Sequence, residues 1–219
     1  MILYGTDFSK IELLEDIVDE QFTVDAYDTW INLENDNILD GSETVTSLDG
    51  STTYVRGTDY EIDYENGKIK VLSSGSMDLD DYLIDYTHKA YTWTFSAEDG
   101  FEMEFWFERE ILAKIKLQSG EIVESTLGWR LHWQARVMEW DAYSLSDFVR
   151  LMCSWPSATR RIWLYPRPSY LKRYNGVRYY EVLPPEDFKL DFLGGKWQGV
   201  GLTIKLVQKD IDPSLPIHE

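Results

Sequence analysis

The sequence is poor in the residues that carry most enzyme chemistry. Among 219 residues there is one cysteine, Cys153, and there are three histidines, His88, His132 and His218. A single cysteine excludes an intrachain disulfide, so the sequence does not call for an oxidising compartment. No Gly-x-Ser-x-Gly elbow, His-Glu-x-x-His motif or Cys/His cluster occurs. The sequence therefore has no motif that indicates a serine hydrolase or a zinc enzyme. We therefore expect a protein that is not an enzyme and has no cofactor and no metal.

Long hydrophobic runs are also missing from the sequence. No window approaches the roughly 18 apolar residues of a membrane-spanning helix. The first residues, Met1–Asp7, show no basic stretch followed by an apolar one, so they do not resemble a secretory signal. We expect folding in a cytosol and no association with a membrane.

Positive charge is scarce in the first part of the chain. Residues 1–90 carry 21 acidic and 5 basic side chains, whereas residues 91–219 carry 18 and 16, and the net charge is −18. The segment Trp129–Arg178 reverses the sign, with 9 basic against 3 acidic side chains. The overall charge argues against non-specific nucleic-acid binding. The uneven distribution fits either a solvated surface or head-to-tail complementarity between copies or with neighbouring proteins.

Aromatic residues are abundant, with 9 Trp, 14 Tyr and 9 Phe. They favour strands and are enriched at protein–protein interfaces. We predict a mainly β protein made of β-sandwich domains with one or two short helices. The predicted division is an acidic domain over residues 1–90, with an N-terminal helix and a small β-sandwich, and an α+β domain over residues 91–219, with one helix and a C-terminal arm.

The first domain shows one helical pattern, followed by short strands. Ser9-Lys10-Ile11-Glu12 matches a capping box, and apolar residues follow at helical spacing, which predicts a helix over residues 9–21. The clearest hairpin is predicted at Asn66-Gly67, because this dipeptide supplies the positive φ angles of a tight turn. Strands are expected at residues 30–33, 43–47, 52–55, 60–64, 68–72 and 82–86.

The second domain is predicted to contain longer strands around one helix. The helix is expected at about Leu145–Trp155, ended by Pro156. In Trp129–Trp140, alternation places Trp129, Leu131 and Trp133 on one face. The remaining strands are expected at residues 92–95, 102–107, 111–117, 122–126, 161–165, 179–183, 188–192 and 198–207.

A basic and aromatic segment is the best candidate for an interaction site. Prolines and a glycine make residues 165–176 a long loop, and long loops in compact domains are often functional. Arginine and tyrosine dominate interface hot spots. We expect an interface formed by Arg160, Arg161, Tyr165, Arg167, Tyr170, Arg173, Tyr174 and Arg178. The alternative is that this loop folds onto the acidic half of its own chain.

Other kinds of site have weaker support. Glycoside hydrolysis needs paired carboxylates, for which Glu102, Glu104, Glu108 and Glu110 are the candidates in an aromatic setting. The acidic runs 34–40 and 78–81 are rich in oxygen ligands for calcium, but they lack the EF-hand spacing and are interpreted as solvated turns. A carbohydrate-binding or host-adhesion module is the alternative function, supported by tryptophans at positions 93, 106, 129, 133 and 197.

Two stretches resemble bacteriophage virion proteins. The run Val55–Ile69, with Gly57-Thr58-Asp59-Tyr60, Asp63-Tyr64 and Asn66-Gly67, resembles a motif in a small β-domain of phage tail, fibre and head-attached proteins. In its order of elements, the second domain resembles the tail-tube and distal-tail family, whose fold pairs a β-sandwich with one helix and a long projecting hairpin or loop.

This resemblance implies a structural protein of the virion, in the tail, baseplate or head–tail ring, with no catalytic residues. Its partners would be copies of itself in a ring and neighbouring virion proteins. It implies no specific recognition of nucleic acid, because DNA would only pass through a channel whose acidic wall repels it. The acidic N-terminal half departs from the resemblance, because a minimal tube protein does not need it.

Overall fold

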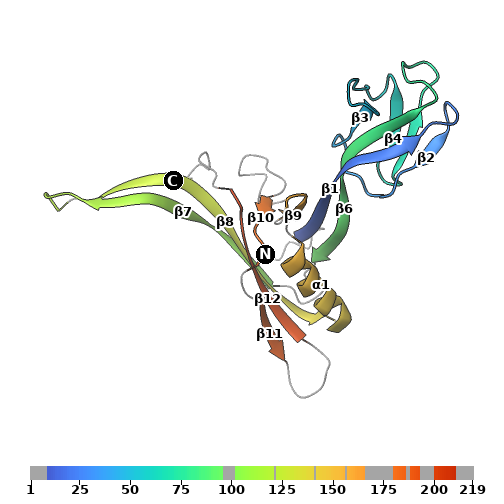
Figure 1. Ribbon diagram of the computed structural model, residues 1–219. Helices are drawn as coiled ribbons and strands as arrows, with labels where there is room; N and C mark the ends of the chain where they lie inside the picture. The colour runs from blue at the N-terminus through green and yellow to red at the C-terminus, as the bar shows by residue number, and fades with distance from the viewer. Residues whose placement is uncertain are drawn as a thin grey trace, which may run out of the picture. The chain divides into compact units, whose positions relative to one another are not determined.

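The protein is mainly β in its computed structural model, as the sequence predicts. The structure describes residues 9–95, 102–120, 122–140, 142–155, 157–165, 180–185, 188–192 and 200–210. Figure 1 shows the strands and the helix, which are β1 Ser9–Thr23, β2 Trp30–Asn32, β3 Thr44–Ser47, β4 Tyr60–Asp63, β5 Lys68–Val71, β6 Asp81–Phe95, β7 Glu102–Lys116, β8 Ile122–Trp140, α1 Ala142–Ser154, β9 Arg160–Tyr165, β10 Tyr180–Val182, β11 Phe188–Phe192 and β12 Val200–Val207.

The prediction of a helix over residues 9–21 is wrong, because this segment is strand β1. It lies between β9 and β6 in a five-stranded sheet of order β10-β9-β1-β6-β3. Leu13 and Leu14 are consecutive and both fully buried, which a strand achieves when both of its faces are covered. The acidic residues at helical spacing have partners on other strands: Glu12 accepts a hydrogen bond from Tyr165, and Asp16 accepts one from Thr87.

The chain folds as two compact units, each assembled from separate stretches. The unit that we call the acidic unit comprises Leu13–Thr92 and Ser157–Arg160. The other, the arm-bearing unit, comprises Met1–Glu12, Trp93–Pro156 and Arg161–Glu219. The sequence predicts a single division near residue 90, whereas here the first residues of the chain belong to the same unit as its last part.

The acidic unit has a compact core under short strands. Strands β2, β5 and β4 form one sheet, and β3 pairs with β6. The hairpin predicted at Asn66-Gly67 is confirmed, because β4 pairs antiparallel with β5 on either side of it. The core contains the buried side chains of Phe22, Val24, Ile38, Val45, Tyr60, Ile69, Val71, Met77, Tyr82, Ile84 and Tyr86.

The arm-bearing unit contains a four-stranded sheet of order β11-β12-β8-β7. On β8, Leu131 and Trp133 are fully buried, as the alternation in the sequence predicts. Helix α1 is confirmed near its predicted position, and its Phe148 is fully buried, with its ring edge-on to Trp93. This one helix among the described residues is too short and too polar to cross a membrane.

The end of β12 joins the two sheets of the arm-bearing unit. The backbone N–H of Gln208 donates to the Leu131 carbonyl, and the Leu131 N–H donates to the side-chain oxygen of Gln208. On the other side, Gln208 bridges to Val182 of β10, and the Lys209 N–H donates to the carbonyl of Glu181. Gln208 therefore bonds to both sheets. It marks the point beyond which β8 pairs, among the described strands, with β7 alone.

Several predicted strands merge into longer ones. The strands expected at residues 82–86 and 92–95 are parts of β6, and those expected at 102–107 and 111–117 are parts of β7. The strand expected at 52–55 is reduced to an isolated bridge between Thr46 and Thr53. The merged strands matter most at β7 and β8, because together they form a hairpin that extends beyond the other strands of its sheet (Figure 1).

Candidate interaction site

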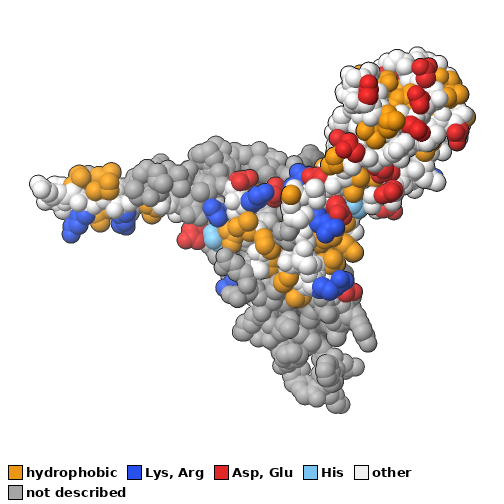
Figure 2. All heavy atoms as spheres, viewed as in Figure 1, with side chains coloured by type: hydrophobic (Ala, Val, Ile, Leu, Met, Phe, Trp, Pro, Cys, Tyr) orange, Lys and Arg blue, Asp and Glu red, His pale blue; other side chains and the backbone are white. Residues whose placement is uncertain are grey.

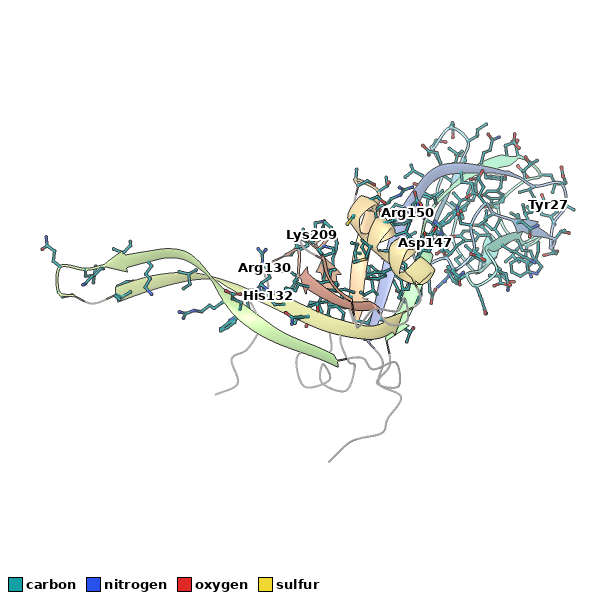
Figure 3. The ribbon with its side chains drawn as sticks, turned by 90° about the horizontal axis from the view of Figure 1, so that it is seen from below. Tyr27, Arg130, His132, Asp147, Arg150 and Lys209 are labelled. Carbon is teal, nitrogen blue, oxygen red and sulfur yellow. The ribbon has the colours of Figure 1, made fainter. Side chains whose placement is uncertain are left out.

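The outer part of the β7–β8 hairpin, Glu108–Arg130, is the candidate site, and we call it the arm. Strand β12 pairs with β8 only from His132 to Trp140, so within the described sheet the arm is a ribbon of two strands. At roughly 3.3 Å per residue, it is about 30 Å long. Arg130 and His132, labelled in Figure 3, mark its base on β8.

The arm carries large aliphatic side chains in exposed positions. Ile115 is 59% exposed, Ile122 52% and Val123 46%, and Ile111 and Leu117 are exposed as well. The turn beyond them is polar, with Gln118, Ser119 and Gly120 all exposed, and the Gly120 N–H donates to the Leu117 carbonyl. The apolar residues therefore form a band below a polar turn, rather than an apolar tip.

The two faces of the arm differ in chemistry. Ile115 pairs directly with Val123, which places both on one face. Lys114 and Lys116 alternate with Ile115 and lie on the other face, together with Ile122, which pairs with Lys116. Figure 2 shows hydrophobic side chains along one side of the end of the arm and basic side chains along the opposite side. Among the described strands, β7 is also an edge of its sheet, and an edge strand can pair with a strand of another chain.

An arm of this kind is unusual in a protein that works alone. A two-stranded hairpin without a packed face is only marginally stable in water. Exposed aliphatic residues that gather in one place mark interaction surfaces more often than scattered ones do. The arrangement offers a binding surface for another protein, and sequence reasoning missed it. Its alternation is typical of a half-buried strand, and no local signal showed that the described sheet has only two strands along the arm.

The predicted basic interface is only partly described, and its described members have partners within the chain. Arg160 donates a hydrogen bond from Nε to Glu15 at 2.8 Å, and its Nη2 forms an ion pair with the same carboxylate oxygen at 2.7 Å. The Tyr165 hydroxyl donates to Glu12, and the ammonium of Lys10 lies over the Tyr165 ring. Arg161 is partly buried on β9. The remaining predicted residues, Arg167, Tyr170, Arg173, Tyr174 and Arg178, lie outside the described residues.

Glu15 also faces a histidine within the acidic unit. Its carboxylate lies 3.7 Å from Nε2 of His88, which is buried. Burial lowers the pKa of His88, although the negative charge of Glu15 acts in the opposite direction. The ion pair of Glu15 with Arg160, with His88 beside it, is thus a structural support between strands.

The run Val55–Ile69 of the acidic unit places its polar residues in structural roles. Asp59 is buried, and its carboxylate accepts hydrogen bonds from the N–H groups of Val55 and Ser76 and from the Ser76 hydroxyl. The hydrogen bond from the Val55 N–H is the main cause that holds the pKa of Asp59 below its usual value. The carboxylate thereby joins two loops.

Tyr64, from the same run, donates to Glu43 at 2.9 Å and contacts Arg56. Arg56 also pairs with Asp40 at 2.9 Å. Burial, followed by the hydrogen bond to Glu43, raises the pKa of Tyr64 to about 12. The phenol thus keeps its proton at neutral pH, and this cluster too serves as a structural support.

The alternative sites gain little from the geometry. Of the candidate carboxylates, Glu108 lies 3.2 Å from Nε2 of His132, and the side chains of the other three lie outside the described residues. Trp133, a candidate for stacking on sugars, is fully buried. In the part of the chain that the structure describes, no three His, Cys, Asp or Glu side chains gather closely enough to hold a metal ion.

No protein-family model and no curated protein matches this chain. The functional argument therefore depends on the residues and on the geometry of the arm.

Proposed function

We propose that the chain is a structural assembly protein of a bacteriophage virion, a ring component of the tail, baseplate or head–tail junction, and that its copies associate through the arm. The observation that carries the assembly part is the two-stranded arm with its exposed band of Ile115, Ile122 and Val123. The resemblance of Val55–Ile69 to phage β-domains supports the virion part.

Physical reasoning favours protein association as the use of the arm. Each exposed aliphatic side chain gains about 1 kcal/mol or more when it is buried against a partner. Insertion of the arm into a lipid bilayer is less favourable. The polar turn at Gln118–Gly120 would enter the bilayer first, and its backbone polar groups would be buried in lipid. Packing along the side of the arm buries the band and leaves the turn in water.

Sedimentation velocity of the full-length protein over a range of concentrations tests the assembly part. We expect oligomers that grow with concentration, and we expect Ile115→Ser combined with Val123→Ser to return the protein to monomers, because both aliphatic partners are then lost. The matched control combines Val18→Ser with Leu48→Ser, two residues that are 62% and 53% exposed outside the arm. A wild-type protein that stays monomeric at high concentration would overturn this proposal.

The virion part needs a separate measurement. Particles purified from cells that carry the gene and release phage should contain peptides of this chain, in an amount that corresponds to several copies per particle. Mass spectrometry with isotope-labelled reference peptides measures both quantities. Particles that lack the chain, in cells that do express it, would contradict the virion assignment and leave the assembly part standing.

A further inference from the structure

A second exposed segment of this chain has the same pattern as the end of the arm, with charges of opposite sign. On the arm, Ile115 lies between Lys114 and Lys116, and all three are exposed. In the acidic unit, Leu79 is 52% exposed and lies between the exposed residues Asp78 and Asp80. Each segment thus places one aliphatic side chain between two charges, and the charges have opposite sign.

The acidic segment is held in place by the fold of its own unit. The Asp78 N–H donates to the Tyr82 hydroxyl, and the Asp80 carbonyl accepts from the Val24 N–H. The next residue, Asp81, accepts a hydrogen bond from Thr23. Because the backbone is fixed while the side chains of residues 78–80 point outward, binding there loses little conformational entropy.

The position of β7 at an edge makes both faces of the arm reachable at once. A partner that lies along an edge strand meets side chains from both faces of that strand. An acidic segment lying along this edge can place its two carboxylates beside the lysines and its leucine beside Ile115. A partner lying flat on one face would meet either the lysines with Ile122 or Ile115 with Val123, and not the lysines and Ile115 together.

We propose that the edge of the arm around Lys114–Leu117 binds the segment Asp78–Asp81 of a second copy of this chain. This inference rests on the proposed function, since it names the partner surface for the same arm. The charge balance supports this choice of partner: Leu13–Thr92 carries 19 acidic and 4 basic side chains, whereas the end of the arm, Ile111–Val123, carries 2 basic and 1 acidic. The contact is head-to-tail, and contacts of this type close into rings or continue as filaments.

Reversing one charge on each surface tests the proposal. We expect Lys116→Asp or Asp78→Lys alone to weaken self-association of the full-length protein by about fivefold or more, because each change places like charges side by side. Mixing the two variants should restore association, since the altered arm of one then meets the altered segment of the other. Sedimentation velocity measures all three samples, and circular dichroism checks that each variant is folded.

The matched controls make the same change in net charge as the test variants, but at other positions. Lys205→Asp and Asp25→Lys change exposed residues outside both segments, so neither should weaken association by more than about twofold. Association that persists in Lys116→Asp and Asp78→Lys, or that the mixture fails to restore, overturns this partner surface while the assembly function stands. Wild-type protein that stays monomeric overturns both, and so does a monomer that floats with phosphatidylcholine–phosphatidylglycerol vesicles.

Discussion

The acidic unit and the arm are both built from antiparallel strands, but their side chains find partners in different places. In the acidic unit, a carboxylate such as Glu15 or Asp59 has partners within the unit, and aliphatic residues such as Ile69 are buried. On the arm, Ile115 and Val123 are directly paired and yet remain exposed on their shared face. The difference shows that strand pairing alone does not bury side chains. A sheet buries them only when another element packs against its face.

The largest effect is expected at Gly67, in the acidic unit. This residue has φ of 57°, and a Cβ would overlap the carbonyl oxygen of Asn35, which approaches because the Leu33 N–H donates to the Gly67 carbonyl. Gly67→Ala should lower the free energy of unfolding by about 3 kcal/mol or more. Thermal or urea unfolding measures the loss.

Gly50→Ala is the matched control for this substitution. Gly50 has φ of 70° and open space around the Cβ position, so the change should cost about 1 kcal/mol from backbone strain alone. Equal losses of stability at the two glycines would show that the close approach of Asn35 adds no steric cost at Gly67.

A smaller effect is expected when the buried carboxylate of Asp59 is replaced. Asp59→Asn keeps the shape but replaces one accepting oxygen with an NH₂ group that faces a donor, which should cost about 2 kcal/mol at pH 7. Asp25→Asn, at an exposed position, should stay within about 0.5 kcal/mol of the wild type.

The same carboxylate predicts how stability depends on pH. Its folded-state pKa is depressed, so its contribution is fully present above the unfolded aspartate pKa of about 3.9 and is lost as pH falls from there through the folded value. Urea unfolding between pH 7 and pH 3 should therefore show a smaller acid-induced loss in Asp59→Asn than in the wild type. An identical slope in both proteins would contradict this role.

The smallest effect on stability is expected on the arm. Ile115→Ser and Val123→Ser should each change the free energy of unfolding of the monomer by no more than about 0.5 kcal/mol, because both side chains already face water. Ile69→Ser, which empties a fully buried position of the acidic unit, should cost about 3 kcal/mol or more. The unfolding is measured on dilute protein, below the concentration at which it associates. A large loss of stability from the arm substitutions would show that the arm packs within its own chain.

Where local chemistry decides the structure, the sequence was informative. Asn66-Gly67 predicted the β4–β5 hairpin, because the positive φ that such a turn needs is a property of the dipeptide itself. Pro156 predicted the end of the helix in a similar way, because proline cannot continue a helix, and α1 ends at Ser154. The alternation from Trp129 to Trp133 identified the buried face of β8, because one face of that strand covers a core.

Where distant partners decide the structure, the sequence misled. The spacing of acidic and apolar residues in Ser9–Thr23 suited a helix, but Glu12 and Asp16 bind Tyr165 and Thr87, which lie 153 and 71 residues away in the chain. The sequence likewise predicted two strands, at residues 82–86 and 92–95, where the structure has one strand, β6. For the arm, the sequence correctly predicted strands at residues 111–117 and 122–126. It held no sign that the pairing of β12 with β8 ends at His132, so that the described sheet has only two strands beyond that point.

The insertion of Leu13–Thr92 between two stretches of the arm-bearing unit has a consequence for protein engineering. Strands β1 and β6 are neighbours in one sheet, and each crosses the boundary between the two units, at Glu12–Leu13 and at Thr92–Trp93. The longer of the two stretches that form the acidic unit, Leu13–Thr92, therefore begins and ends on adjacent strands. A short turn could replace this stretch, or a foreign module with closely spaced termini could be grafted there, while the flanking scaffold keeps its connectivity.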